Sequence, residues 1–315
     1  MYFYANTNHL KKTQLATALK IISFIFYAWN DALCKKLTTG SIAPLATHTV
    51  IFYQYALAAC IIAPFYLYQK DSTKHIVGIP YHLLRTLLCT TGIILLNQSF
   101  TIMPLSYAVS FNLLSPLITV IWASIWFKES MSHQKIFALT LSIVAYFVLL
   151  DSSKYSTSTL SIQSCLKPTI ALLCFQANTV ITKKLTQLKE TNSHLTLFLF
   201  ISIPLLLMPF ELQGISQLSW QQSLTILHMA INGAIATLAL HQAIAFAELT
   251  FLLPFGFLKY SIISFFGYLY FFETPNTYHL IGILLTISAI YHLNRAEKKK
   301  YPGPSVDNIP PKKLA

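Results

Sequence analysis

Long apolar runs separated by short polar interruptions dominate the sequence. Residues 86–127 contain no Asp, Glu, Lys or Arg, which is long enough for two membrane spans of about 20 residues each. Because the runs are continuous and do not alternate apolar with polar positions, they favour transmembrane helices over barrel strands. Dividing them at their polar interruptions predicts an all-α, polytopic membrane protein with ten transmembrane helices, at 14–36, 48–68, 80–99, 105–127, 134–150, 168–186, 194–210, 223–246, 249–272 and 277–294.

Composition and charge support a membrane protein and indicate its orientation. The chain is 55% hydrophobic and only 10% charged, whereas a soluble domain carries about 25% charged residues. With both termini in the cytoplasm, the cytoplasmic segments hold fifteen Lys and Arg residues, and the external loops hold four. This bias follows the positive-inside rule for the bacterial inner membrane. The net charge of +12 is therefore a topology signal, not evidence for nucleic acid, and the basic cluster at 295–300 can contact anionic lipids of the bilayer.

An internal repeat relates the two halves of the chain. Asn30, Lys35, Lys36 and Leu37 recur as Asn178, Lys183, Lys184 and Leu185 at an offset of 148, and Gln98 recurs as Gln242 at an offset of 144. Each copy holds five predicted spans, so the second copy enters the membrane from the opposite side. Inverted repeats are typical of secondary transporters, which bind substrate near the midplane and alternate access by rocking their halves.

The repeat gives an expected division of the chain into five parts. These parts are a cytoplasmic N-terminus (1–13), a first five-helix repeat (14–150), an external linker (151–167), a second five-helix repeat (168–294) and a disordered basic cytoplasmic tail (295–315). The first apolar run exceeds twenty residues and lacks a small-residue cleavage site, which predicts an anchor and not a signal peptide. The five cysteines form no CxxC pair, so no metal or cofactor is expected.

Together with the repeat, the fragment MPLSYAVSFNLLSPLITVIWASIWFKE (103–129) resembles the fourth helix of the drug/metabolite transporter superfamily, in its ten-helix EamA-type members. The resemblance covers about residues 14–294. A narrower likeness is to the S-adenosylmethionine carriers of intracellular bacteria, whose first helix carries an Asn-Asp pair like Asn30-Asp31. Those carriers have an Arg and a Glu three apart in the ninth helix, where this sequence has Gly256 and Lys259.

Charged and amide side chains within predicted spans are the candidate site residues. A charge at the centre of a span costs roughly 2.5–3.5 kcal/mol, so such groups usually face a cavity or a partner. Lys259 either binds a substrate carboxylate or phosphate, shuttles a proton, or forms a charge pair with Asp31. Asp31 has a second candidate partner in Lys35, four residues later. The repeat mates Asn30 and Asn178 either contact a polar ligand or join helices through amide hydrogen bonds.

Two predicted walls complete the candidate cavity. One face of the fourth helix carries polar residues at helical spacing and an aromatic residue toward one end, and the ninth helix repeats this face. The predicted lining comprises Asn112, Ser115, Trp122, Phe255, Phe266, Gln98 and His241. A histidine on an apolar helix, such as His241, is more often a packing residue than a proton carrier, although imidazole can do either. Proline removes a backbone donor and kinks a helix, which makes Pro254 and Pro116 the candidate hinges. The resemblance implies that helices one, three, four, six, eight and nine line the cavity.

The sequence therefore predicts a secondary active transporter of a small polar metabolite and not an enzyme. No nucleotide-binding or hydrolase motif occurs, which disfavours ATP-driven transport by this chain alone. The substrate is amino-acid-like or nucleoside/cofactor-like, and S-adenosylmethionine uptake or exchange is a specific alternative. Coupling through proton or substrate antiport and a monomeric or homodimeric state are compatible with the sequence. A lipid-modifying membrane enzyme, a channel and a sensor are the alternatives from other classes.

Overall fold

The computed structural model describes residues 2–40, 44–68, 78–111, 162–211, 218–252 and 255–272, with scattered positions between 118 and 144 and between 281 and 295. This described part is helical and contains no strand. Its helices are α1 (Tyr2–Thr39), α2 (Thr47–Tyr68), α3 (Ile79–Phe100), α4 (Leu105–Ser110), α7 (Ile162–Gln187), α8 (Asn192–Glu211), α9 (Trp220–Phe246), α10 (Leu249–Leu252) and α11 (Gly256–Phe271).

Most of these helices lie where the apolar runs predicted them, but several ends differ. α1 begins at Tyr2 instead of near residue 14, and α7 begins at Ile162, inside the predicted external linker. Hydropathy marks only the apolar part of a helix, so polar turns that continue a helix beyond that part leave no signal. The predicted span 249–272 is described as α10 and α11. The predicted helices at 105–127, 134–150 and 277–294 lie largely outside the described residues.

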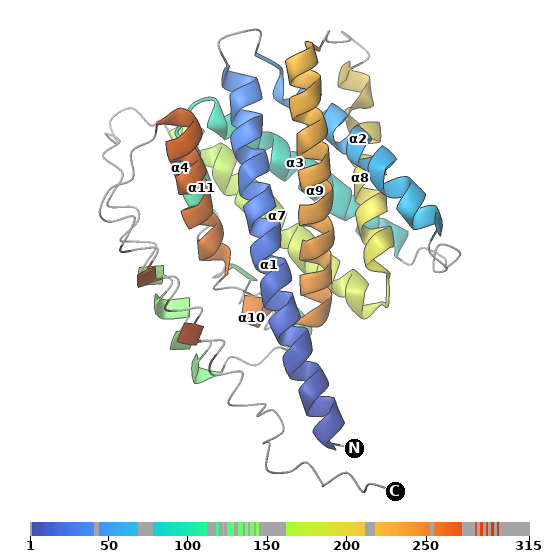
Figure 1. Ribbon diagram of the computed structural model, residues 1–315, viewed down its shortest axis with the longest axis vertical. Coiled ribbons are helices and arrows are strands. Elements are labelled where there is room, and N and C mark those ends of the chain that lie inside the picture. The colour runs from blue at the N-terminus through green and yellow to red at the C-terminus, as the bar shows by residue number, and fades with distance from the viewer. Residues whose placement is uncertain are drawn as a thin grey trace, which may run out of the picture.

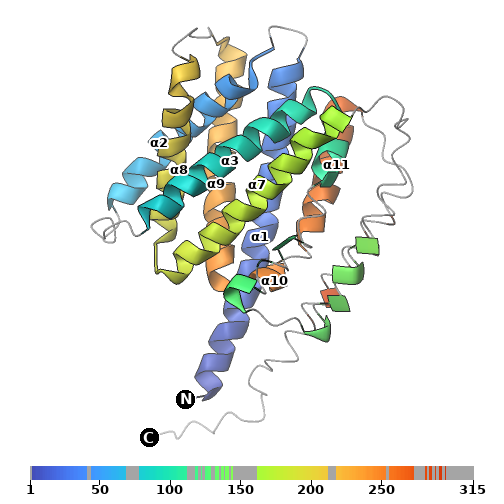
Figure 2. The ribbon, with the colours of Figure 1, turned by 180° about the vertical axis from the view of Figure 1, so that it is seen from behind.

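Three helix pairs form the centre of the molecule. α1 packs along α9, α3 packs along α7, and α2 packs along α8 (Figures 1 and 2). α11 lies against α1. The α3–α7 pair is close because Gly92 has no side chain: a Cβ atom there would lie 2.9 Å from the ring of Phe175. Consecutive long helices run in opposite directions, so α1 and α7 point opposite ways along the bundle (Figures 1 and 2).

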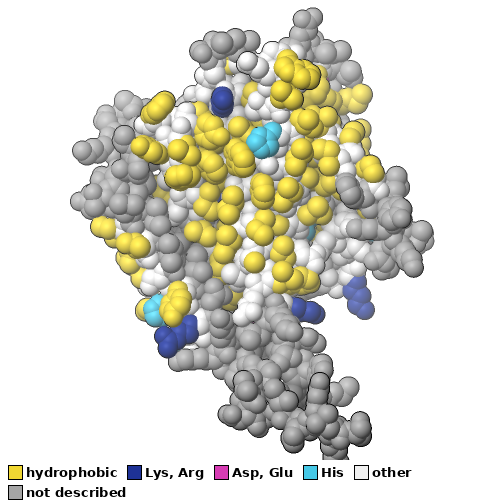
Figure 3. All heavy atoms as spheres, in the orientation of Figure 1, with side chains coloured by type: hydrophobic (Ala, Val, Ile, Leu, Met, Phe, Trp, Pro, Cys, Tyr) yellow, Lys and Arg dark blue, Asp and Glu magenta, His cyan; other side chains and the backbone are white. Residues whose placement is uncertain are grey.

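The outer surface is suited to a bilayer. Among the described residues, four helices are long and apolar enough to cross a membrane, at Thr47–Pro64, Ile79–Phe100, Asn192–Glu211 and Trp220–Phe246. Large apolar side chains on these helices point outward, including Leu83, Leu205 and Phe210, which are 53%, 62% and 61% exposed. On the face in Figure 3, hydrophobic side chains cover the middle, and the visible Lys and Arg lie near the two ends. The chain is a multi-pass membrane protein.

Candidate functional site

A cavity of about 250 Å³ lies between the paired helices. One face of α1 forms a wall of it, because Lys20, Phe24, Tyr27, Asp31 and Cys34 all line the cavity and recur at the spacing of a single helix face. The other walls come from α2, α3, α7, α8 and α9, and from α10 and α11 near the end of the chain. The cavity is therefore shared by both halves of the chain.

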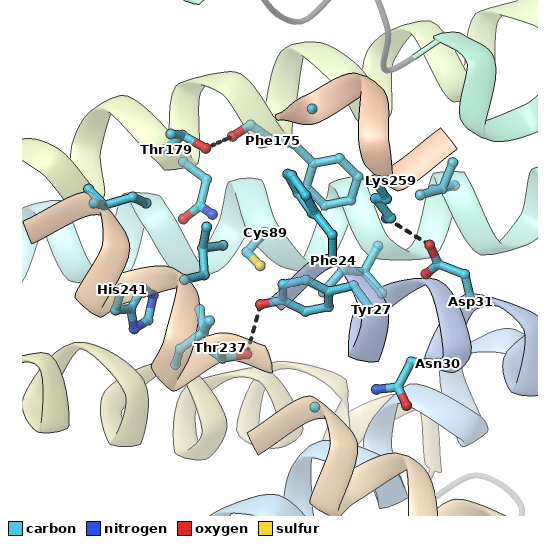
Figure 4. A pocket seen from close by; sticks show the side chains of 18 of the residues that line it. Phe24, Tyr27, Asn30, Asp31, Cys89, Phe175, Thr179, Thr237, His241 and Lys259 are labelled. Atoms are coloured by element: carbon cyan, nitrogen blue, oxygen red, sulfur yellow. Dashed lines mark hydrogen bonds and ion pairs between the residues drawn. The ribbon is translucent and has the colours of Figure 1, made fainter. Parts of the chain in front are cut away.

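An ion pair between α1 and α11 lies at one end of this cavity. Lys259 Nζ is 2.7 Å from Asp31 Oδ2, and the two side chains are 19% and 16% exposed. Figure 4 shows both side chains directed toward each other across the gap between the helices. Lys35, the second candidate partner, instead lies 3.5 Å from the carbonyl oxygen of Met103 and 4.7 Å from the ring centroid of Phe271. Asp31 thus neutralises the buried ammonium group of Lys259, which lowers the cost of holding both charges in the membrane.

The predicted repeat mates Asn30 and Asn178 both line the cavity. Asn30 Nδ2 donates to the carbonyl oxygen of Met229 at 3.0 Å, which joins α1 to α9. Among the described residues, the Oδ1 atoms of Asn30 and Asn178 are buried without a hydrogen-bond partner. A buried carbonyl oxygen without a donor costs about 1–3 kcal/mol. These two amides therefore offer acceptors to a ligand that carries N–H or O–H groups.

Tyr27 and Thr237 face each other in the middle of the cavity. The Tyr27 hydroxyl lies 2.9 Å from Thr237 Oγ1, joining α1 to α9 (Figure 4). Cys89 of α3 lies beside them, and Gln176 of α7 accepts from Thr119 at 2.5 Å. The centre of the cavity is thus aromatic and uncharged, with hydroxyl and amide groups for orienting a polar ligand.

His241 lines the end of the cavity opposite the ion pair (Figure 4). Thr196 Oγ1 donates its hydrogen to the carbonyl oxygen of Asn192. It therefore accepts a hydrogen bond from the Nδ1–H group of His241, at 2.7 Å. His241 Nε2 is then free to accept from Arg85 Nη2 at 3.4 Å. This arrangement holds a neutral imidazole in one tautomer. Behind it, Arg85 is buried and donates to the carbonyl oxygen of Leu195 at 2.7 Å.

A second buried polar cluster lies beyond Arg85. Glu190 is hydrogen-bonded to His194, and its other oxygen lies 3.8 Å from His82 Nε2. The side chains of all three residues are at most 1% exposed. The cluster joins α3 to the connection between α7 and α8, outside the lining of the cavity.

Several predicted site residues lie outside the lining of this cavity. Helix rotation turns Asn97 toward the cavity and Gln98 away from it. Phe255 is fully buried against Phe251, and Phe266 stacks on Trp29 with ring centroids 6.1 Å apart. Trp122 packs beside Trp126. Four predicted residues lie outside the described part of the chain, namely Asn112, Ser115, Pro116 and Pro254.

Most of the residues that line the cavity were not among the predicted lining, and three of them could have been found from the sequence. Lys20 is an ionisable residue within a predicted span, so the argument that identified Lys259 would also have found it. Tyr27 lies one turn before Asp31 on the same helix face, and Gln54 is a polar residue within the second predicted span. Helical spacing from Asp31 would have been enough to find Tyr27.

Comparisons with known proteins show which families and proteins the chain is similar to. Residues 14–151 match the EamA-like transporter family. The S-adenosylmethionine uptake transporter of Rickettsia felis is 23% identical over 279 residues, which cover 89% of this chain and 92% of that protein. The riboflavin transporter of Vibrio cholerae is 23% identical over 264 residues, which cover 81% of this chain and 85% of that protein.

A protein of known crystal structure shares the fold, with a TM-score of 0.70 over 88% of this chain and 98% of its own, at 11% sequence identity. The family match covers the first half of the chain, and the two transporters align along most of its length. These matches confirm the resemblance to EamA-type members of the drug/metabolite transporter superfamily and identify the chain as a small-molecule transporter.

Proposed function

We propose that this chain is a secondary active transporter, and not an enzyme, that moves a small polar metabolite across the bacterial cytoplasmic membrane by alternating access. The observation that carries the proposal is the cavity shared by both halves, with the Asp31–Lys259 ion pair at one end. A charged pair from two different halves can separate when the halves rock. Substrate groups can then replace each partner of the pair.

Helix packing supports two inverted five-helix repeats within a ten-helix bundle. By the predicted repeat, α1 corresponds to α7, α2 to α8 and α3 to α9. If each helix is replaced by its counterpart in the other repeat, the α1–α9 pair becomes the α7–α3 pair. These two pairs are also the ones that pack most extensively. α2 packs against its own mate, α8. Corresponding helices run in opposite directions along the bundle, as an axis in the membrane plane requires (Figures 1 and 2).

Two lysine contacts repeat this relation in detail. Lys35 of α1 approaches the carbonyl oxygen of Met103, just after α3. Its repeat mate Lys183 of α7 donates to the carbonyl oxygens of Ile244 and Ala247, at the end of α9, at 2.9 and 2.7 Å. Met103 and Ala247 are separated by the same offset of 144 that relates Gln98 to Gln242. A lysine thus contacts the backbone at the end of a helix at each end of the bundle. We infer that the two contacts stabilise the closed state of the two gates, by which we mean the two ends of the bundle that open in turn during transport.

The substrate contacts follow from the cavity chemistry. Lys259 binds a carboxylate or phosphate, and Asp31 binds an amine or another cationic group. Further polar contacts to the substrate come from other lining residues, namely Asn30, Asn178 and His241. Asn112 and Ser115 stay predictions for the fourth helix. The relatives named for S-adenosylmethionine uptake and riboflavin transport suggest these two molecules as first probes, with S-adenosylmethionine the more specific candidate.

The remaining features of the proposal concern topology and coupling. Both termini lie in the cytoplasm, because the predicted cytoplasmic segments hold most of the Lys and Arg residues. Coupling is to a proton or to a second substrate, and the chain acts as a monomer or a homodimer. The chain divides at 150 and 168, and the end of the family match at residue 151 supports the first of these boundaries.

Counterflow in proteoliposomes tests the proposal. Vesicles preloaded with unlabelled S-adenosylmethionine or riboflavin should transiently accumulate the labelled compound, because a carrier exchanges substrate across the membrane. Lys259→Met and Asp31→Asn should abolish the accumulation, and Lys36→Met, an exposed lysine on α1, should preserve it. Equal accumulation by Lys259→Met would overturn the assigned site. Rapid equilibration without counterflow would indicate a channel.

A further inference from the structure

The lining of the cavity carries more positive than negative charge. Its described charged residues are Lys20, Asp31 and Lys259. Asp31 and Lys259 neutralise each other at 2.7 Å. Lys20 remains as a single additional cation on the same wall, and its ammonium group is repelled by that of Lys259. Among these described residues two amines face one carboxylate, so a protonated Lys20 has no carboxylate of its own in the lining.

Lys20 has apolar surroundings. Its ammonium group lies 4.6 Å from the ring centroid of Phe24. Phe24 belongs to an apolar cluster with Ile244 and Leu252, both of which also line the cavity. Among the described residues, no carboxylate lies within ion-pair distance of Lys20. A cation–π contact contributes about 0.5–2 kcal/mol, which does not replace a counter-ion in an apolar setting.

The position of Lys20 separates it from the ion pair along α1. Lys20 and Asp31 lie on the same face, three helical turns apart, which is a rise of about 16 Å along the helix axis. Tyr27 lies between them and presents its ring and hydroxyl to the cavity. A ligand that reaches both ends is therefore elongated, with an aromatic or polar middle.

We propose that Lys20 is an anion-binding residue and that the substrate is an organic anion whose carboxylate or phosphate binds there. This inference rests on the proposed transport function and specifies the substrate class of that site. The body of the substrate lies along Tyr27, and its opposite end meets the Asp31–Lys259 pair. The anionic group supplies the counter-ion that Lys20 lacks among the described residues.

Matched probe pairs that differ by one phosphate test the charge preference. Binding of riboflavin and riboflavin 5′-phosphate, and of adenosine and adenosine 5′-phosphate, is measured on the purified protein in detergent without phospholipid. The phosphorylated member of at least one pair should bind at least about tenfold more tightly, a difference of 1.4 kcal/mol. Lys20→Met should remove this preference and leave the affinity for the neutral member within about twofold. Lys12→Met, an exposed lysine of the same helix, should leave the preference intact.

The empty protein provides a second test that needs no ligand. Removing an uncompensated cation from apolar surroundings should raise the midpoint of thermal unfolding, so Lys20→Met should be at least about 2 °C more stable, about 1 kcal/mol for a large domain. Lys12→Met should show no such rise. A lower or unchanged midpoint for Lys20→Met would overturn the inference, since it would mean that the charge is already compensated.

The outcomes separate this inference from the proposed function. Equal affinity for charged and neutral probes, or a phosphate preference that survives Lys20→Met, overturns the role of Lys20 whether or not counterflow is observed. A preference that appears only after anionic phospholipid is added would assign Lys20 to a lipid phosphate and overturn the substrate role. Absence of counterflow with the Lys20-dependent preference intact would overturn carrier function and leave the anion site in place.

Discussion

Replacing Lys259 by Met should destabilise the protein by about 2–4 kcal/mol, because it leaves the Asp31 carboxylate without its partner inside the membrane. At the observed 2.7 Å, two unit charges attract by about 6 kcal/mol at an effective dielectric constant of 20. Desolvation of both ions opposes this attraction, and removing one partner of a fully buried pair costs about 3–5 kcal/mol. Both side chains retain some exposure to the cavity, so the expected cost of about 2–4 kcal/mol lies below that of a fully buried pair.

Thermal unfolding in detergent, followed by intrinsic fluorescence, measures the effect. Asp31→Asn should also destabilise, since it leaves the Lys259 ammonium group unpaired. The double variant should be more stable than the sum of the single losses predicts, with a coupling free energy of about 2 kcal/mol. Lys36→Met serves as the control, because Lys36 is an exposed lysine on α1 with the same change in side-chain chemistry.

Additive single losses, within about 0.5 kcal/mol, would refute this reasoning, because independent sites add within that range. Such a result would mean that water in the cavity already screens the two charges from each other. The gates would then close without help from this pair, and the role of Lys259 would rest on substrate binding alone.

Three further variants test other contacts. Gly92→Ala should cost about 1–3 kcal/mol in thermal unfolding, because its Cβ would lie 2.9 Å from the ring of Phe175, and a loss below about 0.5 kcal/mol would show that α3 and α7 can separate freely. Lys183→Met should cost about 1–3 kcal/mol and speed hydrogen exchange at the end of α9, since two carbonyl oxygens lose a charged donor. Tyr27→Phe should cost about 1 kcal/mol, and adding Thr237→Val should recover part of this loss by removing the unpaired hydroxyl.

The apolar pattern predicts the membrane helices well and their ends poorly. Burial in lipid requires a continuous apolar run, so α2, α3, α8 and α9 leave a direct trace in the sequence. The first twelve residues of α1 carry no such trace, because a helix that continues beyond the lipid can be polar. Likewise, the predicted span 168–186 begins at Pro168, which lies inside α7, six residues after the helix begins at Ile162.

Charge in a span was a better guide to the cavity than aromatic patterns. Asp31 and Lys259 were singled out because isolated charges are costly in lipid, and both line the cavity. Lys20 satisfies the same criterion. Phe255 and Phe266 fit the helical spacing of a cavity wall, but apolar rings pack equally well between helices, so spacing alone does not separate the two environments.

Gln98 shows a different cause of error, which is helical phase. A helix turns by 100° per residue, so a one-residue shift in the inferred face selects Gln98 in place of Asn97. The repeat alignment could not correct this shift, because Gln98 and Gln242 match each other and neither lines the cavity. An internal match reports a common origin for two positions, whereas facing a cavity also depends on how far each helix is rotated.

The lysines at the two ends of the bundle show which part of a repeat the sequence can reveal. Lys35 and Lys183 are visible as a matched pair, but their partners are backbone carbonyl oxygens, which any residue can supply. Met103 and Ala247 therefore occupy corresponding positions in the two repeats, although their side chains differ. A contact of this kind constrains the identity of the lysine and almost not that of its partner. The sequence therefore reveals the lysine, and the carbonyl partner is found only once the helices are packed.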